Sequence, residues 1–499
     1  MGMGIKKKIG KERMAGVLMP VSSLPSEDGA GSFGMEAYKF VNILARMGVT
    51  IWQILPLNPL GFGNSPYQPY SSFAGDELYI DIGLLEKEGY LKQKRGPYTV
   101  EGTPGRIAYD RVRAYKEPYL REAYRVFWEK ESEREGFLKF RKMDWVYPYA
   151  VFAALKKQND QRCWNEWPKE QQDWILDRKY DISHLKEEIQ YQMFLQYMFL
   201  RQWSRLKKYA NKKGVRIMGD IPFYVGIDSL DVWQCREDFL LDEDGRPRFI
   251  AGVPPDYFSE VGQRWGNPIY DWENLEKNNF QFWVKRLKYS CKLYDIIRID
   301  HFRAFDTYWK IPSSCETAVE GEWVEAPGYR VFDRILEELP DIQIVAEDLG
   351  DLRDEVLTLR DHYHFLGMNI AEFSLLSTQD VKMHQLIYTG THDNQTAAGW
   401  YRNLDEQEKK KVRRKLMTFG MPWESISAKM VRFVYRSKAC MAIVPLMDIL
   451  ELDDAARLNT PGTVGSPNWE WRLTDFDRLC RYQNRMRKMI RFSGRQADR

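Results

Sequence analysis

Eight short apolar runs recur along the chain and constrain its fold more than any other feature. Each run is rich in Val, Ile and Leu and ends abruptly in polar residues, Pro or Gly. Runs of this kind fit strands that are buried on both faces of a parallel sheet, although a buried helix segment can show the same pattern. The runs begin at positions 16, 50, 215, 295, 342, 365, 386 and 440.

Amphipathic patterns of helical length lie between most of these runs. Examples span residues 35–48, 279–294 and 351–363. Eight buried strands that alternate with helices predict a protein of the α/β class, a (β/α)₈ TIM barrel whose right-handed connections let the sheet close on itself. Because no linker or repeat divides the chain, we expect residues 1–499 to form a single barrel domain.

Two intervals between the runs are too long for simple crossovers. The first interval, residues 58–213, follows the second run and is about 155 residues long. It carries helical patterns and predicts an inserted, mainly helical subdomain. Residues 226–278, after the third run, are rich in Pro, Gly and Asp and predict a loop-rich insertion that borders a groove. Both insertions follow the carboxyl ends of strands, which is the face where such barrels carry active sites.

The charge balance and the hydropathy of the chain argue against several classes of partner. Lys and Arg total 74 against 71 Asp and Glu, and the resulting net charge of +3 leaves no basic excess for nucleic acid. The most apolar stretch, at 193–200, is far shorter than the roughly 20 residues that cross a bilayer. We therefore expect neither a nucleic-acid partner nor a membrane partner.

The six cysteines and the N-terminus bear on the compartment. The cysteines are scattered without a CxxC pair, which argues against a zinc site and against a disulfide scaffold. The basic start of the chain is not followed by the apolar segment of a secretion signal. These features predict a cytoplasmic protein with reduced thiols.

Acidic residues stand at the ends of four of the predicted strands, namely Asp220, Asp300, Glu347 and Asp393. Any one of them alone can be a solvated or salt-bridged strand end. A barrel, however, brings its strand ends together at one rim, and like charges held close together have pKa values that are pushed apart. Acid/base chemistry uses such a separation, so the four carboxylates predict a catalytic rim.

The neighbours of Asp300 and Glu347 suggest different roles for these two residues. Arg298 stands two residues before Asp300 on the same face of the strand, and an adjacent Arg favours the ionised carboxylate that a nucleophile needs. A purely structural salt bridge is the alternative. Glu347 follows an apolar run, and a carboxyl at the edge of an apolar barrel has a raised pKa that suits a proton donor.

Two of the six histidines lie directly beside these carboxylates. His301 follows Asp300, and His392 precedes Asp393. This placement favours hydrogen bonds from the imidazoles to a polar ligand over a purely structural role. The spacings typical of metal ligands, such as HExxH or an EF-hand loop, do not occur, so we expect no metal site.

Aromatic residues make up 14% of the chain, and two Gly- and Pro-rich segments bring some of them to the predicted rim. Segment 61–75 contains Tyr67 and Tyr70, and segment 251–272 contains Tyr257 and Trp265. An aromatic ring flanked by hydrogen-bond donors matches a sugar, which has an apolar C–H face and a hydroxylated edge. The alternative is that such rings only hold the long loops against the barrel.

Taken together, these motifs resemble the 4-α-glucanotransferases known as amylomaltases or disproportionating enzymes, glycoside hydrolase family seventy-seven. The similarity covers roughly residues 16–490, and it implies a barrel without the C-terminal β-domain of related amylases. The motifs that carry it are PVSSLPS, GNSPYQ, GDIPFYV, DSLDVW, GVPPDYFSEVGQRWGNPIYDW, RIDHFR, AEDLG, GTHDN, NTPGT and NWEWR.

The resemblance implies specific site residues. Asp300 would be the nucleophile, Glu347 the general acid/base, and Asp393 the carboxylate that binds sugar hydroxyls and stabilises the transition state. Phe258 would belong to a mobile active-site loop and contact the glucan. The residues implied to contact the glucan are Tyr67, Asp220, Trp265, Arg298, His301, His392 and Asn468.

The sequence departs from the family pattern at two positions near these motifs. Ala304 stands in FRAF where FRGF is usual, and Gln395 stands in GTHDNQ where GTHDND is usual. Neither residue is one of the catalytic carboxylates. The departures leave the local loop geometry and the subsite preference open.

The implied activity is transfer of α-1,4-glucan segments from a donor maltodextrin to the 4-hydroxyl of an acceptor glucan or glucose. A retaining double displacement requires carboxyl groups of Asp300 and Glu347 about 5 to 5.5 Å apart. The reaction needs no cofactor, and the protein would be a monomer or homodimer. An α-glucan hydrolase of the amylase type is the alternative. A glucan-binding protein without catalysis would lack a carboxylate, and all three are present.

Overall fold

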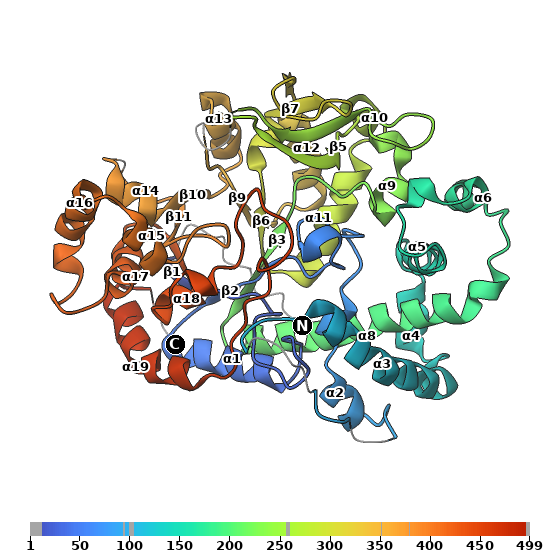
Figure 1. The fold of residues 1–499 in the computed structure, drawn as a ribbon, viewed down its shortest axis with the longest axis horizontal. Coiled ribbons are helices and arrows are strands. Elements are labelled where there is room, and N and C mark those ends of the chain that lie inside the picture. Colours follow the sequence, from blue (N-terminus) through green and yellow to red (C-terminus); the bar gives the residue numbers. More distant parts are fainter. Residues whose placement is uncertain are drawn as a thin grey trace.

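The computed structural model describes residues 12–92, 95–98, 104–255, 260–350, 352–378 and 380–495. An eight-stranded parallel sheet forms its centre, with helices around it (Figure 1). The strands of this sheet, in the order in which they pair, are β10 (Gly367–Ile370), β11 (Gln385–Tyr388), β12 (Met441–Pro445), β1 (Met14–Leu18), β2 (Ile51–Gln53), β3 (Arg216–Ile221), β6 (Ile296–Ile299) and β9 (Ile344–Ala346).

The sheet closes into a barrel where β9 meets the start of β10. The backbone N–H of Ala346 donates to the carbonyl of Leu366 at 2.8 Å, and Val345 pairs with Leu366 in a parallel bridge. All eight apolar runs of the sequence form these strands, and most of their residues are buried. The predicted (β/α)₈ barrel is therefore confirmed.

Helices cover the outside of the barrel. The amphipathic patterns at 35–48, 279–294 and 351–363 correspond to α1, α11 and α13. Most barrel strands are separated by at least one helix, as the alternating pattern predicts. The helices outside the long insertion are α1 (Met35–Met47), α9 (Leu230–Gln234), α10 (Trp272–Lys277), α11 (Gln281–Leu293), α12 (Gly328–Glu338), α13 (Asp354–His362), α14 (Ala371–Leu376), α15 (Ala397–Asn403), α16 (Glu406–Leu416), α17 (Ile426–Arg436), α18 (Leu446–Ile449) and α19 (Asp477–Phe492).

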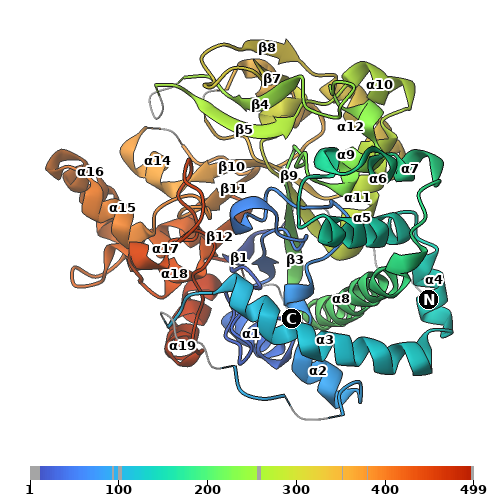
Figure 2. The same cartoon turned by 45° about the vertical axis from the view of Figure 1, so that its right-hand side comes forward.

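The interval between β2 and β3 is mainly helical among its described residues. Most of its long helices gather on one side of the barrel (Figure 2). They are α2 (Ile82–Lys87), α3 (Tyr109–Glu131), α4 (Glu135–Arg141), α5 (Val146–Gln158), α6 (Lys169–Gln172), α7 (Trp174–Asp177) and α8 (Lys186–Lys212). The last of these leads directly into β3 and so also serves as the crossover between the two strands.

A second, four-stranded antiparallel sheet stands above the carboxyl ends of the barrel strands (Figure 2). Its strands, in pairing order, are β5 (Gln263–Pro268), β4 (Phe249–Val253), β7 (Thr307–Pro312) and β8 (Glu322–Glu325). The sequence predicted a loop-rich insertion at 226–278, and the strands β4 and β5, which no periodic pattern indicated, lie there. The polar composition of β5, which is partly exposed along its first four residues, explains why no strand pattern was recognisable.

Short 3₁₀ helices connect several of these elements, and some of them lie close to the site described below. They are η1 (Phe62–Asn64), η2 (Glu77–Tyr79), η3 (Trp164–Glu166), η4 (Ser183–Leu185), η5 (Arg236–Asp238), η6 (Phe302–Phe305), η7 (Met417–Phe419) and η8 (Asp454–Ala456). Among the described residues, no helix is both long enough and apolar enough to cross a membrane.

Candidate active site

Two neighbouring barrel strands place Asp220 and Arg298 opposite each other. Asp220 in β3 and Arg298 in β6 are partners in the strand register, and both are buried. Nη1 of Arg298 donates to both carboxylate oxygens of Asp220 at 2.7 Å and to Oδ1 of Asp300 at 2.9 Å. Burial alone would lower the pKa of Arg298, but the two carboxylates hold it well above its ordinary value.

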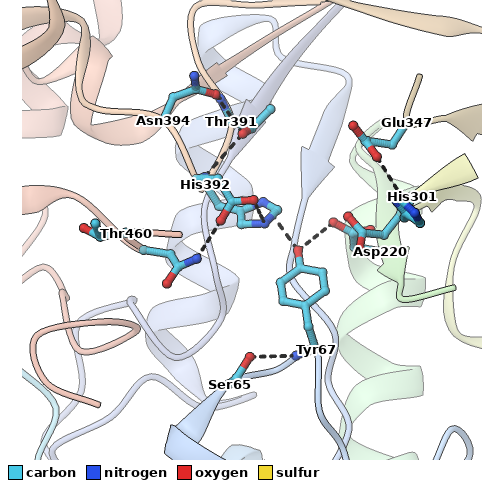
Figure 3. A network of polar contacts seen from close by, with 12 residues as sticks. Ser65, Tyr67, Asp220, His301, Glu347, Thr391, His392, Asn394 and Thr460 are labelled. Atoms are coloured by element: carbon cyan, nitrogen blue, oxygen red, sulfur yellow. Dashed lines mark hydrogen bonds and ion pairs between the residues drawn. The ribbon is translucent and has the colours of Figure 1, made fainter. Parts of the chain in front are cut away.

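Glu347 follows β9, and backbone N–H groups of the segment after β6 donate hydrogen bonds to it. The backbone N–H of His301 donates to Oε2 of Glu347 at 2.9 Å, and the N–H of Phe302 donates to the backbone carbonyl of Glu347 at 3.0 Å (Figure 3). His301 has a φ of 51°, in the left-handed region that residues with a side chain rarely adopt. The surrounding contacts therefore hold a strained backbone that directs this N–H at the carboxyl group.

The environment of Glu347 favours its protonated form. Burial and the neighbouring charges of Asp300 and Asp348 outweigh the attraction of Arg298, and they raise the pKa of Glu347 to about 7. Burial has the opposite effect on an imidazole, and it lowers the pKa of His301 to about 4. Near neutral pH, the site thus contains a carboxyl group that can give or take a proton beside a neutral histidine.

Asp393 lies in the loop after β11, and each of its carboxylate oxygens has a partner. Oδ2 is 3.2 Å from Nε2 of His392, and Oδ1 accepts a hydrogen bond from Nδ2 of Asn459 at 2.7 Å. Burial raises the pKa of Asp393, but His392, Asn459 and Arg298 more than offset it and lower the pKa to about 2. In turn, Asp393 raises the pKa of His392 against the effect of burial.

Tyr67 lies between Asp220 and His392 and so connects the Asp220–Asp300 side of the site to the Asp393 side. Its hydroxyl donates to Oδ2 of Asp220 at 2.9 Å and lies 3.4 Å from Nδ1 of His392 (Figure 3). Its ring stacks on the imidazole of His392, with the two centroids 5.0 Å apart. A continuous chain of polar contacts therefore runs from Asp300 through these residues to Asp393.

A cleft of about 1330 Å³ opens over this chain. Its volume exceeds that of most sites for a single small ligand and suits a chain of linked units. The predicted site residues that line it are Tyr67, Trp265, Asp300, His301, His392 and Asp393. Arg298 and Asp220 lie buried beneath them, and partly buried Glu347 contacts His301 from the side.

The aromatic residues of the two segments over the rim have different surroundings. Trp265, on β5, contacts His301 edge-on, with the ring centroids 4.9 Å apart, and faces the cleft. Tyr70 does not line the cleft and packs under Nζ of Lys156 at 4.6 Å, so it holds its loop against α5. Tyr257 and Phe258, the latter predicted to contact the glucan, lie outside the described residues.

Asn468 is close to the cleft, but it is buried and its polar atoms have backbone and side-chain partners. Its Oδ1 accepts from the backbone N–H of Thr460 at 2.9 Å, and its Nδ2 donates to Oγ1 of Thr463 at 2.9 Å. Thr460 and Thr463 both line the cleft. Asn468 therefore shapes this part of the wall by holding the turn.

Several residues of the cleft were not recognised in the sequence. Trp469 has a ring centroid 5.8 Å from that of Tyr67 and 5.9 Å from that of His392. The other unrecognised lining residues include Ser65, Gln68, Tyr224, Arg457 and Asn459. Asn459 belongs to the NTPGT motif and Trp469 to the NWEWR motif, so the motifs alone could have drawn attention to these two residues. Nothing in the local sequence indicates that Asn459 contacts Asp393 or that Trp469 packs near Tyr67.

The arrangement provides the groups that acetal chemistry needs. Glu347, beside the cleft, is partly protonated near neutral pH, and Asp393, in the lining of the cleft, stays ionised. Asp300, which Arg298 contacts, is part of the lining and open to a ligand. Across the described part of the chain, no group of three or more His, Cys, Asp or Glu side chains could hold a metal ion.

Comparisons with known proteins agree with this arrangement. The sequence profile of a protein family described as 4-alpha-glucanotransferase matches residues 19–478. A 4-alpha-glucanotransferase of Thermus thermophilus is 42% identical over 504 residues, which cover 97% of this chain and 99% of that protein. A 4-alpha-glucanotransferase of Aquifex aeolicus is 39% identical, with 93% of this chain and 96% of that protein covered.

A solved structure supports the same assignment. The amylomaltase of Streptococcus agalactiae, determined in complex with acarbose, superimposes with a TM-score of 0.91 at 35% identity, covering 97% of this chain and all of that one. The match extends over the barrel and both insertions rather than over the barrel alone. With a family profile and close relatives that span nearly its whole length, the chain belongs to the 4-alpha-glucanotransferase family of enzymes.

Proposed function

We propose that the cleft transfers α-1,4-glucan segments from a donor maltodextrin to the 4-hydroxyl of an acceptor glucan or glucose, by a retaining double displacement. Asp300 is the nucleophile, Glu347 the general acid/base, and Asp393 the stabiliser of the transition state. The observation that carries this proposal is the arrangement of three carboxyl groups at one cleft: Asp300 and Asp393 line it, and Glu347 adjoins it through the backbone N–H of His301. In this arrangement the pKa of Glu347 is raised to about 7 and that of Asp393 is lowered to about 2. Two such carboxyl environments match the acid and the anion that retaining glycoside chemistry needs.

In the first displacement, protonated Glu347 gives its proton to the glycosidic oxygen. Oδ1 or Oδ2 of Asp300 attacks the anomeric carbon as the bond to that oxygen breaks, and the departing chain leaves with a free 4-hydroxyl. The product is a glycosyl ester on Asp300 with inverted configuration. Arg298, which donates to Oδ1 of Asp300, orients the nucleophile and stabilises its negative charge before the attack.

In the second displacement, ionised Glu347 takes the proton of the incoming 4-hydroxyl. The oxygen of the acceptor attacks the anomeric carbon and the ester bond to Asp300 breaks, which restores the α-configuration. Asp393 stays ionised throughout, so its negative charge stabilises the oxocarbenium-like transition state of both steps. The proton balance over the cycle is zero, and the reaction needs no cofactor.

We propose that the lining of the cleft holds the glucan chain. Trp265 offers an aromatic face, and Tyr67, His301 and His392 present polar groups beside it. The Streptococcus agalactiae relative was solved with acarbose, which supports saccharide binding in the corresponding cleft. Asp220 acts on the glucan through Tyr67, and Asn468 acts through the 460–463 turn. Phe258 stays a predicted glucan contact.

Choice of acceptor decides between a transferase and the alternative, an α-glucan hydrolase of the amylase type. The carboxylates do not make this choice, because water and a sugar hydroxyl can both accept the glycosyl group. We propose that an acceptor glucan bound along the cleft displaces water from the ester. We further propose a cytoplasmic monomer or homodimer, in which 58–213 and 226–278 are insertions of one barrel domain.

Incubation with maltotriose tests the proposal. We expect glucose together with maltodextrins longer than maltotriose, at a nearly constant number of reducing ends, because each transfer breaks one glycosidic bond and forms another. The products are measured by anion-exchange chromatography and by a reducing-sugar assay. Reducing ends that rise in step with the loss of maltotriose, without longer products, would show a hydrolase instead.

Two variants assign the activity to the proposed site. Asp300→Asn removes the nucleophile with little change in shape, and we expect it to lower the rate of glucose release by at least about 1000-fold. Asp341→Asn makes the same chemical change at an exposed position before β9 and serves as the control. Comparable activity in both variants would rule out the assignment of Asp300.

A further inference from the structure

The segment 454–459 lies beside the loop that carries Asp393. It begins with η8, after the last barrel strand, and follows the chain from Asp454 to Asn459. Thr460, the next residue, lines the same cleft as His392 and is labelled in Figure 3. The segment belongs to a part of the chain about 60 residues beyond the loop that it contacts, and the mechanism above assigns it no role.

Arg457 holds the backbone of Asp393. Its Nη2 donates to the backbone carbonyl of Asp393 at 2.7 Å, and its Nε donates to the carbonyl of Asn459 at 2.7 Å. One guanidinium group therefore joins the main chain of the loop to the main chain of the segment. This fixes the distance between Asn459 and Asp393 without a direct backbone contact.

Asn459 holds the side chain of Asp393. Its Nδ2 donates to Oδ1 at 2.7 Å, while Nε2 of His392 lies 3.2 Å from Oδ2. With one donor on each oxygen, the carboxylate plane has a single favoured orientation. About 42% of the Asp393 side chain is still exposed, and it lines the cleft, so the held group remains accessible to a ligand.

Asp454 holds the loop on the other side of Asp393. Its Oδ1 accepts from the backbone N–H of Thr396 at 3.0 Å, and its Oδ2 accepts from Nε2 of Gln395 at 2.7 Å. Gln395 is one of the two departures from the family pattern in the sequence. Its amide donates to Asp454, whereas a second ionised carboxylate at this position would repel Asp454.

We propose that segment 454–459 is a positioning element for Asp393, and that Asn459 is the positioning residue that fixes the orientation of its carboxylate in the cleft. This inference rests on the proposed function, because it assumes that Asp393 stabilises the transition state. Asn459 acts through Asp393 and transfers no proton itself. A carboxylate turned away from the sugar would lose the interaction that is strongest in the transition state.

The charges around Asp393 determine what a change at Asn459 does. His392 of the same loop, Arg298 of β6 and Arg457 of the segment are the positive or titratable groups on that side, and Tyr67 packs on His392. Asn459 adds a neutral donor that lowers the pKa of Asp393. A carboxylate in its place would share a proton with Asp393, as two adjacent carboxyl groups do, and would raise the pH at which the pair first binds that proton.

The test measures the pH profile of kcat/KM for maltotriose in three proteins. In Asn459→Asp we expect the acidic limb to move to higher pH by at least about one unit, because the new pair is protonated, and so inactive, over a wider range. Asn403→Asp carries the same change in charge at the exposed end of α15 and should keep the profile of the unaltered chain. Thermal unfolding, followed by circular dichroism, verifies that both variants are folded.

A second variant separates orientation from charge. Asn459→Leu removes the donor without adding a charge, and we expect kcat to fall about 10- to 100-fold with KM changed less than about threefold, because the lost interaction acts mainly in the transition state. If folded Asn459→Asp keeps the acidic limb of the unaltered chain, or folded Asn459→Leu keeps its kcat, the inference is wrong. Absence of transfer by the unaltered chain would instead refute the proposed function.

Discussion

Asp393 lines the cleft and Glu347 adjoins it, and the pKa values of these two carboxyl groups are shifted in opposite directions. Burial dominates at Glu347, although the backbone N–H groups of His301 and Leu349 donate to its carboxyl oxygens, and nearby carboxylates add to the rise in its pKa. Hydrogen bonds and positive charge dominate at Asp393. The difference arises from the partners that the fold supplies, because the intrinsic pKa values of Asp and Glu differ by less than about one unit.

The raised pKa of Glu347 makes a prediction about pH. A general acid must be protonated, so kcat/KM for maltotriose should fall as the pH rises through about 7, the pKa of Glu347. An α-maltosyl fluoride donor needs little proton assistance because fluoride is a good leaving group. Its kcat/KM should lack this alkaline limb, whereas the same limb with both donors would contradict the role of Glu347.

The roles proposed for Asp300 and Glu347 make opposite predictions about stereochemistry. In Glu347→Ala with α-maltosyl fluoride, Asp300 still forms the ester, and added azide should attack it to give an α-glycosyl azide. In Asp300→Ala, azide should fill the space of the missing carboxylate and attack the donor directly, which gives the β-glycosyl azide. Nuclear magnetic resonance of the products distinguishes the two anomers.

Variants at Asp341 provide the background rate of azide incorporation, since this exposed residue lies outside the cleft. Exchanged configurations, with the β-azide from Glu347→Ala and the α-azide from Asp300→Ala, would reverse the two assigned roles.

Among the elements, β3 shows how tightly the packing beneath the site is determined. Gly219 precedes Asp220 in this strand, and a Cβ added to it would lie 2.2 Å from Cγ of the buried Tyr294. Cβ atoms do not approach other heavy atoms this closely, so the aromatic ring or the strand would have to move. The glycine therefore allows the Tyr294 ring to pack against the strand that carries Asp220.

This packing leads to a prediction about stability. Gly219→Ala should destabilise the protein by about 1 to 3 kcal/mol through overpacking and lower the thermal unfolding midpoint. Gly96→Ala is the matched control, because its added Cβ would be no closer than 3.6 Å to a neighbour. Combining Gly219→Ala with Tyr294→Leu should cost less than the sum of the single changes. Strict additivity would mean that the Tyr294 ring is not the obstacle.

Elements differ in how far their sequence determines them. The barrel strands were predictable because they are buried on both faces and therefore mainly apolar, apart from polar residues such as Asp220 and Arg298. Strand β5 was not, because its residues are polar and partly exposed and its pairing with β4 follows from the tertiary fold. The backbone conformation of His301 could not be predicted either, since nothing in the local sequence RIDHFR indicates a φ of 51°.

For the molecule as a whole, the sequence identified the carboxylates but not all of their partners. Asp220, Asp300 and Glu347 follow or end barrel strands, and strand ends of a closed barrel meet at one rim, so their proximity was predictable. Asn459 and Arg457 reach Asp393 from a later segment, and only the folded chain brings them together. The predicted separation of the Asp300 and Glu347 carboxyl groups stays a prediction.

The charge of the whole molecule makes a prediction about salt. A maltodextrin carries no charge, and the net charge of the chain is only +3, so long-range attraction contributes little to substrate binding. We expect kcat/KM for maltotriose to change by no more than about twofold between 0.05 and 0.5 M NaCl. A decrease of tenfold or more would point to a charged substrate.

Covalent trapping of the nucleophile tests the central claim most directly. A 5-fluoro-α-glucosyl fluoride slows both displacements through its ring fluorine, while the fluoride leaving group keeps the first displacement the faster one. We predict that the glycosyl ester accumulates and that peptide mass spectrometry finds the added mass on Asp300, with none in Asp300→Asn. A label on another residue, or full turnover of the reagent without any labelled peptide, would contradict the account.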